Sequence, residues 1–240
     1  MSNQNPERRR ALQLAFSAAI LAAVAGLTCH PLPAQAKADR LKTVLSQMDA
    51  ASLKFKSAEA DIKKEHFEKI VSDTSGESGT IYFLRAGNSI QVGAKFKNGQ
   101  TLEYKNGTVR LYSEGTNHLD QASATGSNQA RFETFLTLGF GGSGADLAKA
   151  WTITDQGTEQ LADSGKQVQV EKLDLVSKDA SVRNTFSHIT IWVDPARGVS
   201  LKQEYFAPSG NTDTATYSNI RLNQTINVKA YAIKCKGTCS

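Results

Sequence analysis

The chain has 240 residues, a formal net charge of +5 and 40% hydrophobic residues. Its 28 Lys and Arg residues are spread among 23 Asp and Glu residues and do not gather in one segment, which excludes the charge pattern of a nucleic-acid-binding protein. A chain of this length can close one sizeable hydrophobic core, so a single folded domain is expected.

The first 36 residues have the layout of a secretory signal peptide. Residues 1–10 are polar and basic, residues 11–27 carry no charge, and Ala34-Gln35-Ala36 is a small-x-small cleavage site. A membrane anchor is the alternative, but the uncharged stretch is rich in alanine and shorter than the roughly 20 apolar residues of a span. We expect export and a mature domain of residues 37–240, and both the general secretory and the twin-arginine routes fit the basic start.

The first predicted element of the mature chain is an amphipathic helix that starts after Asp39, a candidate N-cap. Its apolar residues recur at steps of three and four: Leu41, Val44, Leu45, Met48, Ala51 and Phe55. From Ser57 the period changes to two, which predicts strands at residues 57–62 and 67–71, followed by a turn at residues 73–76.

A meander of short strands is predicted next, at residues 80–85, 89–96, 101–105 and 108–112. The breaks between them contain Gly87-Asn88, Asn98-Gly99 and Asn106-Gly107. Asn-Gly is the pair favoured in two-residue hairpin turns, so consecutive antiparallel strands are expected.

Two short helices, residues 129–138 and 145–150, are predicted on either side of a glycine-rich elbow. Gly139, Gly141 and Gly144 match the spacing G-x-G-x-x-G, but no strand precedes them and no βαβ unit surrounds them, so nucleotide binding is not indicated. We expect these glycines to let the chain turn sharply against the sheet.

The rest of the chain returns to strands, predicted at residues 151–153, 167–175, 187–193, 199–206 and 212–223. The loop of residues 194–198 carries Pro and Gly where a hairpin turn requires them. Helices grouped against consecutive antiparallel strands predict an α+β fold with a strongly curved antiparallel sheet, an incomplete β-barrel covered by helices.

Neither a catalytic centre nor a cofactor site is indicated by the motifs. There is no G-x-S-x-G elbow, and His66, His118 and His188 have no carboxylate or nucleophile at a catalytic spacing. Cys235 and Cys239 are expected to form a disulfide in an oxidising compartment, with a metal site as the alternative. We therefore expect a protein that is not an enzyme and needs no metal.

Arg85 ends a predicted strand in which Ile81, Phe83 and Arg85 share one face. If that face is interior, the guanidinium needs acceptors, and its five donors suit backbone carbonyls or the polar head of a ligand. The alternative is an arginine at the end of a strand that reaches water.

Taken together, several segments resemble the LolA-like outer-membrane lipoprotein carrier and sorting proteins of Gram-negative envelopes. They are the G-x-I-x-F-x-R strand at residues 79–85, the hairpin at 104–112, the elbow at 136–144, Leu173-Asp174-Leu175, and residues 191–195 with 206–210. The resemblance covers nearly the whole mature chain.

This resemblance implies a monomeric periplasmic carrier. An incomplete barrel covered by a helical lid would receive acyl chains from an inner-membrane lipoprotein exporter and pass them to an outer-membrane acceptor, and Arg85 matches the family arginine that holds the lid closed. Whether the cargo is a lipoprotein or another lipid stays open. The candidate cavity and lid residues are Phe55, Ile81, Phe83, Arg85, Leu102, Tyr104, Phe135, Leu138, Phe140 and Trp192.

Two other classes of function remain as alternatives. One is a lipid- or lipoprotein-sensing module on the same fold that signals to a partner. The other is a hydrolase of unknown type, which would have to cleave acyl esters with a single essential side chain.

Overall fold

The computed structural model of the chain describes residues 33–87, 89–123, 133, 136 and 138–239. Contacts between residues separate Met1–Gln35 from Ala36–Ser240, and the whole sheet lies in the second unit. Most of the predicted signal peptide and most of the helix predicted at residues 129–138 lie outside the described residues.

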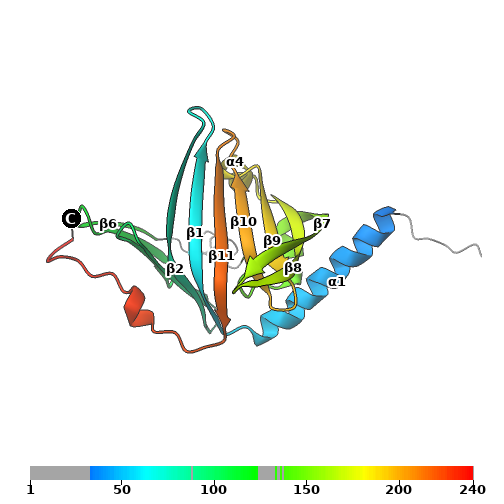
Figure 1. Cartoon of the computed structure of the whole chain (residues 1–240), viewed down its shortest axis with the longest axis horizontal. Helices are drawn as coiled ribbons and strands as arrows, with labels where there is room; N and C mark the ends of the chain where they lie inside the picture. Colours follow the sequence, from blue (N-terminus) through cyan, green and yellow to red (C-terminus); the bar gives the residue numbers. More distant parts are fainter. Residues whose placement is uncertain (1–32, 88, 124–132, 134–135, 137, 240) are drawn as a thin grey trace, which may run out of the picture. The chain divides into compact units, whose positions relative to one another are not determined.

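Eleven antiparallel strands form one sheet in the order β6-β5-β4-β3-β2-β1-β11-β10-β9-β8-β7 (Figure 1). The strands are β1 (Ser57–Glu68), β2 (Asp73–Ala86), β3 (Ser89–Phe96), β4 (Gln100–Lys105), β5 (Thr108–Ser113), β6 (His118–Ser123), β7 (Trp151–Asp163), β8 (Lys166–Ser177), β9 (His188–Asp194), β10 (Val199–Phe206) and β11 (Thr212–Leu222). The first and last strands pair with each other, and they join two meanders into a sheet whose described edges are β6 and β7. The predicted fold class, a curved and incomplete barrel, is confirmed.

The described helices lie against two different parts of this sheet. They are α1 (Pro33–Lys54), α3 (Gly144–Ala150), α4 (Ala180–Thr185) and the short 3-10 helix η2 (Val228–Tyr231). Val44 and Met48 of α1 and Leu147 of α3 are buried in a cluster with residues of β7, β8 and β9. α1 therefore packs on this half of the sheet, whereas η2 contacts β3 and β4.

The start of α1 differs from the prediction, because Asp39 lies inside the helix and is not its N-cap. The carbonyl of Asp39 accepts a bond from Thr43 Oγ1, at 2.9 Å, one turn later. The alanine-rich residues before it have high helix propensity, so the helix extends backward to Pro33.

Turn chemistry explains the hairpins that the sequence revealed. Asn106 and Gly107 have φ angles of 51° and 76° and connect β4 to β5 in the left-handed conformation that Asn and Gly adopt most easily.

The turn predicted at residues 73–76 was wrong. Residues 69–72 make that turn, and Asp73 pairs with Glu68 at the start of β2.

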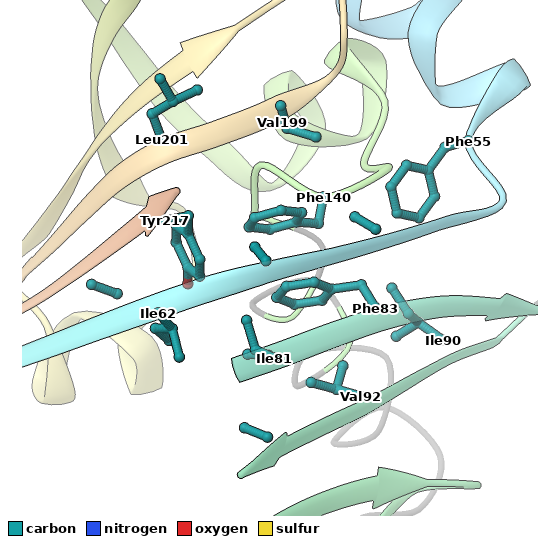
Figure 2. Packing of buried hydrophobic residues seen from close by; sticks show 14 of the residues in the cluster. Phe55, Ile62, Ile81, Phe83, Ile90, Val92, Phe140, Val199, Leu201 and Tyr217 are labelled. Carbon is teal, nitrogen blue, oxygen red and sulfur yellow. The ribbon is translucent and has the colours of Figure 1, made fainter. Parts of the chain in front are cut away.

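A second hydrophobic cluster is centred on β1, β2 and β3. Figure 2 shows Phe83 of β2 facing Phe140 of the elbow, with Tyr217 of β11 beside them. Ile81, Val92 and Val199 surround these rings. The elbow thus closes over this face of the sheet.

Candidate functional site

Within the elbow, Gly139 and Gly141 are held next to β10 by backbone hydrogen bonds. Ser200 N–H donates to the Gly139 carbonyl at 2.6 Å, and Gly141 N–H donates to the Gly198 carbonyl at 3.3 Å. Gly139 and Gly141 have φ angles of 76° and 77°, and a Cβ at Gly141 would overlap the ring of Phe55. The glycines therefore serve a sharp, close-fitting turn.

Phe140 anchors the elbow in the core. Its side chain is fully buried, its ring stacks on Phe83 at a centroid distance of 4.0 Å, and the ring of Tyr217 meets it edge-on at 4.8 Å. This packing is apolar and directional, so it holds the elbow in one place on the sheet.

Arg85 bonds to this elbow. Its Nη2 donates to the Gly141 carbonyl at 2.7 Å, and Ser52 Oγ near the end of α1 donates to the same oxygen, also at 2.7 Å. The Arg85 guanidinium lies 5.8 Å from the centre of the Phe55 ring. One carbonyl oxygen thus connects β2, α1 and the elbow, although Arg85 as a whole residue is exposed.

A pocket of about 700 Å³ opens between α1, α3, the elbow and the turn that links β2 to β3. Met48, Ile90, Leu138 and Leu147 supply apolar lining. Its polar lining residues include Ser52, Arg85, Ser89, Glu133, Ser143, Asp146 and Lys149. The pocket combines apolar lining with polar side chains of the kind that bind the polar head group of a ligand.

Four side-chain hydrogen bonds that the sequence did not reveal hold the chain around this pocket. Gln203 Nε2 donates to the Leu138 carbonyl, while Tyr205 and Tyr217 donate their hydroxyls to Gln203 Oε1 at 2.7 and 3.1 Å. Burial raises the pKa of Tyr217, which keeps it a donor. Tyr104 Oη donates to Glu133 Oε1 at 2.7 Å. The neighbours of Gln203 along β10 are Lys202 and Glu204, so no local pattern marked it as buried.

An ion pair joins the N-terminal half of α1 to strand β7. Arg40 Nε lies 2.6 Å from Asp155 Oδ2 and 4.0 Å from Glu171 Oε2. Burial opposes ionisation of Asp155, but the bonds from Arg40 and from Gly157 N–H outweigh it and lower the pKa of Asp155. Burial, with help from the Asp155 charge, raises the pKa of Glu171.

The predicted cavity residues fall into several places. Phe55, Ile81, Phe83, Tyr104 and Phe140 are buried in the cluster beneath the elbow, and Leu102 packs against it. Leu138 belongs instead to the cluster under α1, although it also lines the pocket. Phe135 lies outside the described residues.

Trp192 is buried in the same hydrophobic cluster as Phe83 and Phe140, but it does not line the pocket. It alternates along β9 with Ile191 and Val193, so it points to the opposite face of the strand from these two residues. The Nζ atoms of Lys172 and Lys202 lie 4.9 and 4.4 Å from the centre of its ring, and Nε1 donates to Glu159. Two lysine ammonium groups therefore make cation-π contacts with the ring of this buried residue.

The three histidines of residues 37–240 each lie near a carboxylate, and for two of them folding brings that partner from another strand. His66 Nδ1 lies 2.7 Å from Asp213, a cross-strand neighbour, and His188 Nδ1 lies 2.6 Å from Asp174. His118 Nε2 lies 3.3 Å from Asp120. Strand pairing creates the first two contacts, so sequence spacing could not reveal them.

Cys235 and Cys239 form a disulfide near the end of the chain, with Cα atoms 5.4 Å apart. The small loop that it closes contacts Asn117, whose Nδ2 donates to the carbonyls of Lys236 and Thr238. Among the described residues, no group of three His, Cys, Asp or Glu side chains could hold a metal ion. None of the described helices has the length and apolar character needed to span a membrane.

No protein-family model and no curated protein matches the chain. MucB, also solved with MucA from Pseudomonas aeruginosa, matches in structure with a TM-score of 0.50 at 11% identity, over 82% of this chain and 63% of that chain. The fold is similar to that of MucB. A LolA superfamily protein from Nitrosomonas europaea covers 80% of this chain and 97% of its own at 12% identity, with a TM-score of 0.37. LprF from Mycobacterium bovis covers 79% and 96% at 14% identity, with a TM-score of 0.42. At these identities the likeness is one of fold.

Proposed function

We propose that this LolA-like protein binds the acyl chains of lipoproteins or lipids between its sheet and its helical cover and carries them through the periplasm toward the outer membrane. An N-terminal signal peptide of residues 1–36 would direct export, and residues 37–240 would form the carrier. Its partners would be an inner-membrane exporter and an outer-membrane acceptor.

The observation that carries this proposal is the pocket beside the elbow. Its volume of about 700 Å³ lies within the range of roughly 300–1,000 Å³ usual for small-molecule sites. Met48, Ile90 and Leu147 offer apolar contacts, and the adjacent elbow is joined to β2 and α1 through the Gly141 carbonyl. An acyl chain could extend the pocket toward Phe83 by displacing Phe140.

The energetics favour a covered site. An exposed acyl chain costs about 0.8 kcal/mol per CH2, so a long chain amounts to on the order of 10 kcal/mol. Release then requires a closed, empty state of comparable stability. The bonds of Arg85 and Ser52 to Gly141, together with the stack of Phe140 on Phe83, would stabilise that closed state.

The Arg85→Leu variant tests this role. It removes one charge-assisted bond at a half-exposed site, worth about 1 kcal/mol, and should change the dissociation rate of a fluorescent fatty acid by roughly fivefold while the protein stays folded. Arg110→Leu is the matched control, because Arg110 pairs with Glu103 on β4, away from the elbow. Unchanged release kinetics and unchanged co-purified lipid in Arg85→Leu would remove Arg85 from the mechanism.

A sensing module would use the same pocket differently. It would bind lipid without delivering it to acceptor membranes, whereas a carrier accelerates transfer between donor and acceptor vesicles. Measuring transfer of a lipopeptide between vesicles, with and without the protein, separates the two functions. Cleavage of acyl esters in the same reaction would instead identify a hydrolase.

A further inference from the structure

The connection between α1 and β1, residues 54–57, is held by a side chain from the other end of the chain. Asn223 follows β11 directly. Its Oδ1 accepts from the N–H groups of Lys56 and Ser57, at 2.7 and 3.3 Å, and its Nδ2 donates to the Lys54 carbonyl at 3.1 Å. A single amide thus binds the last residue of the helix and the first residue of the strand.

The backbone completes this joint. Asn223 N–H donates to the Ser57 carbonyl at 2.8 Å, and Ser57 Oγ donates to the Gln224 carbonyl at 2.8 Å. From the other side, Arg85 N–H donates to the Lys56 carbonyl at 2.9 Å. The last carbonyls of a helix lack partners within it, so Asn223 also caps α1.

This joint is coupled to the elbow. Phe55, the residue between Lys54 and Lys56, is buried against Gly141 and lies beside the Arg85 guanidinium. Rotation of the backbone at Lys56 would withdraw the Phe55 ring from beneath the elbow. It would also break the bonds that the Asn223 side chain makes.

We propose that Asn223 is the positioning residue of a hinge that sets the angle of α1 and controls how readily the helix lifts from the pocket. The control of opening rests on the proposed function, whereas the hinge itself does not. Asn223 has a φ angle of 55°, a left-handed conformation that Asn tolerates better than most residues. Asp could accept the two N–H bonds but could not donate to Lys54.

The Asn223→Gly variant removes the Asn223 side chain and its hydrogen bonds without straining the backbone, because glycine adopts a positive φ easily. Asn219→Gly is its matched control. Asn219 lies within β11 with a φ angle of 52°, and its Nδ2 donates to Asp61 at 2.6 Å, away from residues 54–57. The readout is hydrogen exchange at the Lys56 and Ser57 amides in protein without ligand.

We expect Asn223→Gly to speed exchange at Lys56 and Ser57 by about tenfold or more, since each lost bond contributes about 0.5–1.5 kcal/mol. Asn219→Gly should leave these amides unchanged. Equal exchange in the two variants would overturn the hinge. If Asn223→Gly does not fold, Asn223→Asp replaces it, read at the Phe55 amide that donates to Ser52. Faster exchange there supports the hinge, and unchanged exchange refutes it.

A second measurement tests the hinge and the proposed binding of acyl chains separately. If a fluorescent long-chain fatty acid fails to bind the unaltered protein, the proposed function fails, while the amide exchange still decides the hinge. If the probe binds, Asn223→Gly should increase both its association and its dissociation rates several-fold relative to Asn219→Gly. Rates equal to the control would overturn the control of opening by Asn223.

Discussion

Replacing Phe140 with alanine tests whether the elbow is a separately opening cover. The Phe140 side chain is fully buried, stacks on Phe83 and meets Tyr217 edge-on. Truncation of a fully buried Phe costs about 3–5 kcal/mol. If the elbow opens independently of the sheet, this loss raises its opening equilibrium by a factor of about 100 or more, at 1.4 kcal/mol for each factor of ten.

Two amides report this opening directly. The Ser200 and Gly141 N–H groups donate to Gly139 and Gly198, so they exchange with solvent only when the elbow leaves β10. In Phe140→Ala, their hydrogen exchange under native conditions should become at least about 100-fold faster. A denaturant titration in parallel gives the global free energy of unfolding.

Phe96→Ala is the comparison variant. Phe96 lies in the same cluster but on β3, with the Lys64 ammonium 5.2 Å from its ring centre. It should lower the global free energy of unfolding and leave the Ser200 and Gly141 amides protected. If both variants change exchange at these amides equally, the elbow is an ordinary part of the core and the reasoning is refuted.

Two more substitutions test the ion pair of α1 with β7 and the disulfide between Cys235 and Cys239. The pKa of Asp155 is lowered despite burial, by Arg40 and Gly157, so its contribution to stability is present above its unfolded pKa of about 3.9 and is lost as pH falls through the lower folded value. The melting temperature, measured from pH 6 downward, should therefore fall below about pH 4 in the unaltered protein, and Asp155→Asn should abolish this part of the fall. If the melting temperature of Asp155→Asn depends on pH as it does in the unaltered protein, the proposed role of the Arg40–Asp155 pair is wrong. Cys235→Ser should speed exchange of the Lys236 amide, which donates to Asn117, by about fivefold and leave the Ser200 amide unchanged. Faster exchange at Ser200 would show that the disulfide loop supports more than the end of the chain.

Local patterns predicted much of the sheet. The strands β3 and β10 have the predicted bounds, since apolar alternation and turn residues both mark them. β2 begins earlier than predicted, because Asp73 to Gly79 is polar and partly exposed on both faces and carries no alternation. β6 and α4 were missed for a similar reason. β6 is almost entirely exposed, and α4 is only six residues long.

The site was less accessible to prediction than the fold. Arg85 and the glycine elbow stood out because their residue types are unusual in their segments. The bonds of Ser52 to Gly141 and of Asn223 to Lys56 join residues 89 and 167 positions apart, and no local pattern indicates such partners. Trp192 was a candidate because it lies in the segment 191–195 that carries the resemblance, yet its pairing with Lys202 and Lys172 follows from strand register, which the sequence alone did not determine.

Photocrosslinking with a diazirine fatty acid tests the central claim most directly. After irradiation of the complex, peptide mass spectrometry should place the label on pocket residues such as Met48, Ile90 or Leu147. Binding and labelling should both fall when an excess of unlabelled fatty acid is present. Absence of labelling, or labels confined to surfaces away from α1 and the elbow, would contradict an acyl-binding site beneath the helical cover.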